Sequence, residues 1–178
     1  MLLDANQLAG LAILTGDSPI LDLAREVSAL IIGHGIDAAV IGGVAVVLHG
    51  HLRTTLDVDV YTTQSKELAA ALEAAGFVFN AKDRQFEKGG IPVQLVTPSH
   101  VVDPPTHLQD ISGVRTVSLA DLISIKLRSG SENVLRAQDL ADVIALMRHH
   151  ALDGEFVPRI SKDLRPVFRK LLRAIQNE

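Results

Sequence analysis

The longest apolar stretch of the chain, residues 38–48, is interrupted only by the paired glycines Gly42 and Gly43. A membrane-spanning helix needs about 20 apolar residues, so this stretch is too short to be one. Residues 38–41 are predicted to form a buried strand, and residues 43–49 a short helix that ends at the following glycine. The pattern therefore predicts a strand, a tight turn and a buried helix in immediate succession.

Asp57 and Asp59 lie in a run of β-branched residues, 56–62, which predicts a second strand. Side chains two positions apart on a strand point to the same face, with Cα atoms roughly 6.6 Å apart. Two carboxylates held in this way suit Mg²⁺, which takes one or two carboxylates plus substrate phosphates. Gly42 and Gly43 would let a phosphate approach the backbone. An anion site beside a cation site is what a nucleoside triphosphate needs; the alternatives are a solvated strand end and ordinary turn glycines.

The rest of the chain alternates between helical and extended patterns. Helices are predicted over residues 17–33, 64–75, 118–128, 132–149 and 164–175, with a break at Ser129-Gly130-Ser131. Further strands are predicted over residues 77–80, 85–88, 91–96 and 114–117, with Gly89-Gly90 as a hairpin turn. Residues 97–113 contain three prolines and are predicted to be a long irregular connection. This order predicts an α+β fold, a mixed sheet packed against helices, in a single domain over residues 1–178.

The composition limits both the core and the classes of function. Aromatic residues make up 3% of the chain and there is no Trp, so the core must be aliphatic and no aromatic platform can stack single-stranded bases. There is no Cys, which excludes disulfides and thiolate metal sites. No basic residue precedes the first apolar run, so we predict no signal peptide and a cytoplasmic protein without a membrane partner. A net charge of −4 argues against general affinity for nucleic acid but allows a local basic patch.

The glycine pair and the Asp-x-Asp string also carry a family resemblance. The string is Gly42-Gly43-x-Ala45…His49-Gly50…Arg53-x-Thr55-x-Asp57-Val58-Asp59. It resembles the signature of the polymerase-beta-like nucleotidyltransferase superfamily, in particular small bacterial members of the abortive-infection toxin type and the minimal nucleotidyltransferases. Residues 119–143 resemble the helical tail of the same group. The resemblance covers about residues 36–145 and implies a nucleotidyltransferase core over 36–117, followed by a C-terminal helical extension over 118–178.

The resemblance implies a site and a reaction. Asp57 and Asp59 would bind Mg²⁺ or Mn²⁺ together with the triphosphate of an NTP. Gly42 and Gly43 would seat the triphosphate, while phosphate or sugar contacts are implied for Arg53, Thr55 and Lys126. The reaction would transfer a nucleotide from the NTP to a hydroxyl of a protein, an RNA or a small molecule. A toxin–antitoxin or phage-defence setting, with a cognate antitoxin as partner, would follow by the same analogy.

The chain departs from the family pattern at two positions. The third acid of the family should stand on the strand over residues 91–96, where this chain has Gln94. A glutamine cannot act as a base and is a neutral, weaker metal ligand. Gln138 likewise stands where the family usually has a lysine, directly before Asp139. Candidate substitutes for the missing acid are Glu87, Asp139 and Asp142.

Several alternatives follow from these residues. Without a substitute acid, the chain would be a nucleotide-binding or partner-binding module with lost or altered activity; an antibiotic nucleotidyltransferase is the third possibility. Arg53 either contacts phosphate or pairs with an aspartate, and Lys126 is either a phosphate ligand or an ordinary helix charge. The seven histidines show no metal-ligand spacing. In the last helix an apolar stripe accompanies a basic row at 165, 169 and 173, which is either a solvated face or a surface for RNA or a partner.

Overall fold

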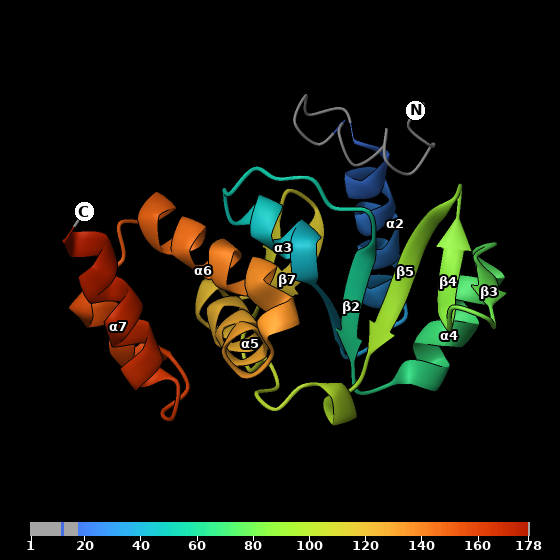
Figure 1. Cartoon of the computed structure of the whole chain (residues 1–178). Coiled ribbons are helices and arrows are strands. Elements are labelled where there is room, and N and C mark those ends of the chain that lie inside the picture. The colour runs from blue at the N-terminus through green and yellow to red at the C-terminus, as the bar shows by residue number, and fades with distance from the viewer. Residues whose placement is uncertain (1–11, 13–17, 178) are drawn as a thin grey trace.

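The computed structural model describes residue 12 and residues 18–177, and within them a seven-stranded sheet carries helices on both faces (Figure 1). The strands lie in the order β3-β4-β5-β2-β1-β7-β6. Central β1 pairs antiparallel with β2 and parallel with β7, while β2 pairs parallel with β5. The outer pairs are antiparallel. The predicted mixed sheet packed against helices is therefore confirmed.

The strands largely follow the predicted positions. They are β1 (Ala38–Ile41), β2 (Val58–Thr62), β3 (Val78–Asn80), β4 (Gln85–Lys88), β5 (Ile91–Val96), β6 (Leu108–Ile111) and β7 (Val114–Val117). Gly89 and Gly90 both adopt positive φ, 60° and 80°, in the turn between β4 and β5. The predicted hairpin is thus confirmed, because two such residues in succession suit glycine.

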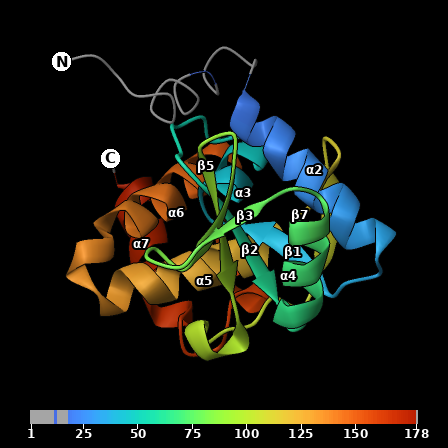
Figure 2. The ribbon, with the colours of Figure 1, turned by 90° about the vertical axis from the view of Figure 1, so that its right-hand side faces the viewer.

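Side-chain alternation along the central strands builds two separate cores. Ala38 and Val40 of β1 pack into a core with helices α2 (Pro19–Gly33) and α4 (Ser65–Ala74). Ala39 and Ile41 point to the opposite face and its own core. That second core is formed with α5 (Leu119–Glu132), α6 (Ala137–His149) and α7 (Arg165–Gln176). Figure 1 shows the three layers, and Figure 2 views them from the side of α2 and α4.

The short helix α3 (Gly42–Leu48) continues directly from β1 and contributes to both cores. Val44 and Val47 face the first core, whereas Ala45 and Val46 face the second. An almost wholly apolar sequence suits this position, because the helix is covered on two sides.

The predicted helix break at Ser129-Gly130-Ser131 is wrong, because α5 continues to Glu132. Gly130 lies where α5 crosses α6: a Cβ added to it would stand 2.7 Å from Cγ of Leu140. The glycine therefore permits a close helix crossing and does not end the helix. The chain then forms a 3₁₀ turn, η3 (Val134–Arg136), before α6 begins at Ala137, so the predicted helix over 132–149 begins later than expected.

The connection over residues 97–113 is more ordered than predicted. It contains a 3₁₀ turn, η2 (Pro98–His100), and the edge strand β6, which pairs with β7. The β6–β7 turn consists of Ser112 and Gly113, with φ of 52° and 80°. The three prolines in the first part of the segment predicted an irregular chain throughout, so the β6–β7 hairpin at its end was not predicted.

The remaining helix ends depend on local caps. Ser18 caps α2 by accepting a hydrogen bond from Leu21 N at 3.4 Å, whereas Asp17, the first residue of the predicted helix, lies outside the described residues. Ser118 caps α5 through Asp121 N at 3.1 Å. A further 3₁₀ helix, η4 (Gly154–Arg159), leads into α7. No helix in the described part of the chain is long and apolar enough to cross a membrane.

Candidate functional site

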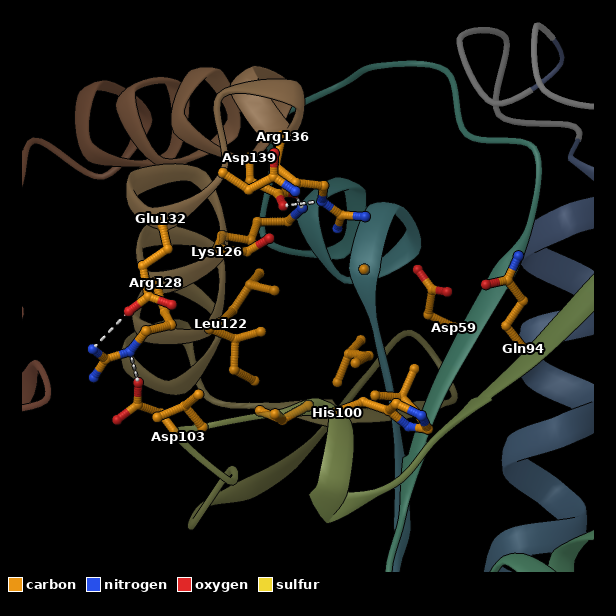
Figure 3. Close-up of a pocket in the computed structure, with 18 of the residues that line it drawn as sticks. Asp59, Gln94, His100, Asp103, Leu122, Lys126, Arg128, Glu132, Arg136 and Asp139 are labelled. Carbon is orange, nitrogen blue, oxygen red and sulfur yellow. Dashed lines mark hydrogen bonds and ion pairs between the residues drawn. The ribbon is translucent and has the colours of Figure 1, made fainter.

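A cavity of about 600 Å³ opens between the second face of the sheet and helix α5 (Figure 3). One wall comes from the β1–α3 junction and from β2 and β5, and the other from α5, η3 and the start of α6. Residues 100–103 form the floor between them. Cavities of this size commonly bind small molecules or cofactors.

Asp59 reaches this cavity because of its position on β2. Val58 and Val60 point into the first core, so the residue between them faces the other way. Asp57, directly before the strand, lines the same cavity. Thr55 orients the Asp57 carboxylate, since its Oγ1 donates a hydrogen bond to Asp57 Oδ1 at 3.2 Å. The two carboxylates are thus brought to one cavity from a single short segment.

The Asp59 carboxylate has no cation in contact with it among the described residues, and its pKa is raised. Burial raises its pKa from 3.8 to about 6, and the negative charge of Asp57 adds to the rise, although the charges of Lys126 and Arg136 oppose it. Among residues 18–177, no side-chain hydrogen bond or ion pair reaches the Asp59 carboxylate. A half-buried carboxylate pair without a cationic partner in contact is a favourable position for a bound cation.

Position 42 must be a glycine because the Asp59 side chain lies against it. Gly42 has φ of +66°, and a Cβ added to it would lie 1.9 Å from Asp59 Oδ2. Gly43 lies against the loop before β2, where a Cβ added to it would lie 2.3 Å from Thr55 Oγ1 and 2.9 Å from Arg53 Nη2. Gly42 lines the cavity and Gly43 does not. Both glycines therefore have a packing reason that is independent of any phosphate.

Gln94 lies on β5 directly beside Asp59, because the parallel register pairs the two residues. Figure 3 shows their side chains next to each other on one wall of the cavity. The strand position where the resemblance places a third acid thus faces the aspartates, and it carries an amide. Its carbonyl oxygen can serve as a neutral ligand, but the amide cannot accept a proton as a base.

The opposite wall holds a buried network of charges. Lys126 is 4% exposed, and its Nζ lies 2.8 Å from Asp139 Oδ1 and 2.8 Å from Asp142 Oδ2. Arg53 donates from Nη2 to Asp142 Oδ2 at 3.1 Å and does not line the cavity. Arg136 donates to Asp139 Oδ2 at 2.9 Å. Of the two alternatives for Arg53, the structure shows the pairing with an aspartate.

The three candidate substitute acids are all engaged elsewhere. Asp139 lines the cavity; burial by itself would raise its pKa, but the charge of Lys126 and hydrogen bonds to it hold the pKa below the ordinary value. Asp142 is fully buried, does not line the cavity and also accepts from Gln138 Nε2 at 2.9 Å. Glu87 lies on β4, outside the cavity lining, and accepts hydrogen bonds from two neighbouring side chains. None of the three stands as a free carboxylate beside Gln94.

The sequence patterns did not identify the far end of the cavity. Arg128 Nε donates to Asp103 Oδ2 at 2.8 Å and Nη1 to Glu132 Oε1 at 3.2 Å, and the guanidinium also contacts Asp163. These bonds attach the 100–103 segment to α5 (Figure 3). Arg136 falls within residues 119–143, and for this residue the resemblance implied only a place in the helical tail. The other residues of this end come from the segment predicted as irregular and from the end of a helix predicted to stop earlier, so no periodic signal marked them.

The donor set also indicates which kind of cation could fit. Among the described residues, no group of three or more His, Asp or Glu side chains is arranged to hold a metal by itself. Asp57 and Asp59 provide two carboxylates at the cavity edge, and Gln94 adds an amide oxygen. This set fits Mg²⁺, which is commonly held by one or two carboxylates and completed by water and substrate phosphates.

Comparison with known proteins gives the family. The model of a family described as "nucleotidyltransferase of unknown function (DUF6036)" matches residues 19–174. No curated protein matches the chain.

Solved structures agree in fold. The solution structure of the antibiotic-resistance factor ANT(2'')-Ia is 17% identical, with a TM-score of 0.58, over 88% of this chain and 95% of that one. A crystal structure of ANT(2'')-Ia in complex with adenylyl-2''-tobramycin is 18% identical, with a TM-score of 0.59, over 84% and 97%. An antigenic nucleotidyltransferase-like protein from Paracoccidioides brasiliensis is 17% identical, with a TM-score of 0.55, over 98% and 91%. The family match covers most of the chain and the fold agrees with it, so the chain belongs to the nucleotidyltransferase family DUF6036, within the nucleotidyltransferase-like superfamily.

Proposed function

We propose that this protein is a Mg²⁺-dependent nucleotidyltransferase that transfers a nucleotide from an NTP to a hydroxyl of an acceptor. The observation that carries the proposal is the Asp57–Asp59 pair, which lines a 600 Å³ cavity and contains a carboxylate whose pKa rises to about 6. A carboxylate raised in this way by burial and by a like charge is typical of a functional site.

The two walls of the cavity have separate functions: one binds the cation and the other balances the charge of the phosphates. Asp57 and Asp59 hold the cation, with the Gln94 oxygen as a neutral accessory ligand. Bound there, Mg²⁺ would neutralise charge on the triphosphate and on the pyrophosphate that leaves. Lys126 and Arg136 face these carboxylates across the cavity and balance the phosphate charge. The acceptor oxygen forms the new bond to the α-phosphorus as the bond to pyrophosphate breaks, and the hydroxyl proton passes to water, since the Gln94 amide cannot accept it.

Other residues position these groups. Asp139 and Asp142 hold the Lys126 ammonium from two sides, so that its charge stays at the cavity wall. Arg53 ties the loop before β2 to α6 through Asp142, and Thr55 orients Asp57. Gly42 allows the close approach of Asp59 and, at the cavity wall, keeps the backbone open to the triphosphate, while Gly43 allows the approach of Thr55 and Arg53.

The proposal is tested by incubating the protein with each of the four α-³²P-labelled NTPs and Mg²⁺, with and without cell lysate. We expect label to pass to an acceptor with wild type and not with Asp57→Asn or Asp59→Asn. Asp110→Asn, an exposed acid on the edge strand β6, is the matched control and should label as wild type. Equal labelling by wild type and both site variants would refute this assignment of the site.

A second candidate is a binding module that retains the cavity without turnover, and Gln94 favours it. Calorimetry separates the two: NTP binding without transfer to any acceptor supports the module. Gln94→Asp restores a carboxylate directly beside Asp59. Transfer that appears only in this variant would show that the natural site binds nucleotide but has lost its third acid.

The acceptor and the biological setting are also part of the proposal. The structural relatives ANT(2'')-Ia make an aminoglycoside one acceptor to test, by measuring the resistance of cells that express the protein. Growth arrest on expression, relieved by Asp57→Asn, would instead support the toxin–antitoxin or phage-defence setting. Protection and arrest are opposite outcomes, so one expression experiment distinguishes them.

A further inference from the structure

A second groove, of about 360 Å³, lies between helix α7 and η4, outside the proposed nucleotide cavity. Its polar lining consists of Arg165, Arg169, Arg173 and Gln176, and Val157 and Leu172 contribute to its apolar floor. Among the described residues, 12 and 18–177, no carboxylate lines it. The basic row predicted from the sequence thus borders a concave surface.

Positive charge is concentrated around this groove. Residues 159–178 contain six basic residues and two acidic residues, a formal charge of +4 in a chain whose total is −4. Of the two acidic residues, Asp163 is bound to Arg128. The end of the molecule that carries α7 is therefore strongly cationic although the protein as a whole is acidic, a separation that favours an anionic partner at this end.

The arginines of the groove have different environments. Arg165 is anchored, because its Nε and Nη2 donate to the carbonyls of Ile160 at 3.0 Å and Pro158 at 2.8 Å. Arg169 and Arg173 are exposed, and within residues 18–177 neither makes a hydrogen bond or ion pair. Residues four apart lie on one helix face and advance about 6 Å per step. Two free guanidinium groups thus continue a row that a fixed one begins.

The apolar face of α7 is not available to a membrane. Phe168 and Leu172 are buried in the second core, and Val167, Leu171 and Ile175 pack against it. A membrane-surface helix needs such a face to enter the lipid. The exposed surface of α7 is therefore a polar, cationic groove, which suits the phosphates of an extended strand.

We propose that this groove binds the backbone of single-stranded RNA. The guanidinium groups of Arg169 and Arg173 contact successive phosphates, and the Gln176 amide, which both donates and accepts, lies where a 2′-hydroxyl can bond to it. Within the part of the chain that the structure describes, no aromatic residue lines the groove to stack a base. Binding is consequently independent of base sequence and strongly dependent on salt.

The test is fluorescence anisotropy with a labelled 20-nucleotide oligouridine and the full chain. Wild type should bind at 50 mM salt, with an affinity that falls steeply as salt rises. Arg169→Gln/Arg173→Gln should weaken binding roughly tenfold or more, and should make the log–log salt slope shallower by about 1.4, since each phosphate contact on a single strand contributes about 0.7. The single variant Lys170→Gln is the control: Lys170 is exposed on the same helix but does not line the groove.

Each further result either supports or overturns the proposal. Both arginines are exposed, so unchanged circular dichroism and Tm should accompany the loss of binding. Weaker binding of the matching oligodeoxyuridine supports the contact to the 2′-hydroxyl, whereas equal binding overturns the assignment to RNA. Equal affinities of wild type and the double variant, or displacement of the RNA by ATP with Mg²⁺, would place any binding elsewhere. Binding to anionic vesicles but not to RNA would overturn the proposal in favour of a membrane surface.

Discussion

Replacing Asp59 by Asn should stabilise the metal-free protein at pH 8. The pKa of Asp59 rises from 3.8 to about 6 in the folded state, first through burial and then through the charge of Asp57. A tenfold change in an equilibrium corresponds to about 1.4 kcal/mol, so ionised Asp59 costs the fold up to about 3 kcal/mol. Cavity water reduces this cost, and we expect about 2 kcal/mol. Asparagine removes the charge at nearly constant volume.

The pH dependence follows from the sign of the shift. The folded state holds the Asp59 proton more tightly than the unfolded chain does. The contribution of Asp59 to the free energy of unfolding therefore falls as the pH rises from 3.8 to about 6, and it is lowest above that range. Asp59→Asn should therefore match wild type below pH 3.8 and exceed it at pH 8.

The assay is thermal unfolding in EDTA at several pH values, then with Mg²⁺ or Mn²⁺. A gain of about 2 kcal/mol raises the Tm of a chain of this size by roughly 4–8 °C. The cation should raise the Tm of wild type and leave that of Asp59→Asn unchanged, because it binds the folded state through the carboxylate pair. A lower Tm for Asp59→Asn at pH 8 without metal, or the same difference at every pH, would refute the reasoning.

Three further substitutions test the packing around the site. Gly42→Ala places a Cβ 1.9 Å from Asp59 Oδ2 at a φ of +66°. It should therefore lower the free energy of unfolding, measured in urea, by about 2 kcal/mol or more, and abolish the Mg²⁺-dependent rise in Tm. An unchanged response of the Tm to Mg²⁺ would contradict this. Gly130→Ala should destabilise by about 1–3 kcal/mol although alanine favours helices, because the new Cβ meets Leu140, and a gain in stability would show that α5 merely tolerates glycine there. Lys126→Met leaves Asp139 and Asp142 without their shared ammonium and should cost about 3–5 kcal/mol; Lys126→Met with Asp139→Asn should recover part of that loss, and the absence of any recovery would argue against the ion pair as its cause.

Strand alternation and local caps made much of the fold predictable. The apolar pattern over residues 38–48 and the aspartates at 57 and 59 predicted β1 at both ends, and α3 and β2 with errors of at most two residues. Such signals are local, since each depends on neighbours within one helical turn or one strand. Gly130 shows where local reasoning fails: the same residue breaks an isolated helix, but here it allows a close crossing with α6.

The sequence by itself determined the mixed α+β class, the aliphatic core and the presence of the Asp57–Asp59 pair and of Gln94 on separate strands. Only the tertiary structure decided how these groups meet. Arg53 pairs with Asp142 across 89 residues, and Gln94 lies beside Asp59 because β2 and β5 are neighbours in the sheet. The raised pKa of Asp59 likewise depends on what is packed around it. Periodicity reports which face of an element is buried, but the partners on that face come from distant parts of the chain, and their contacts leave no periodic trace in the sequence.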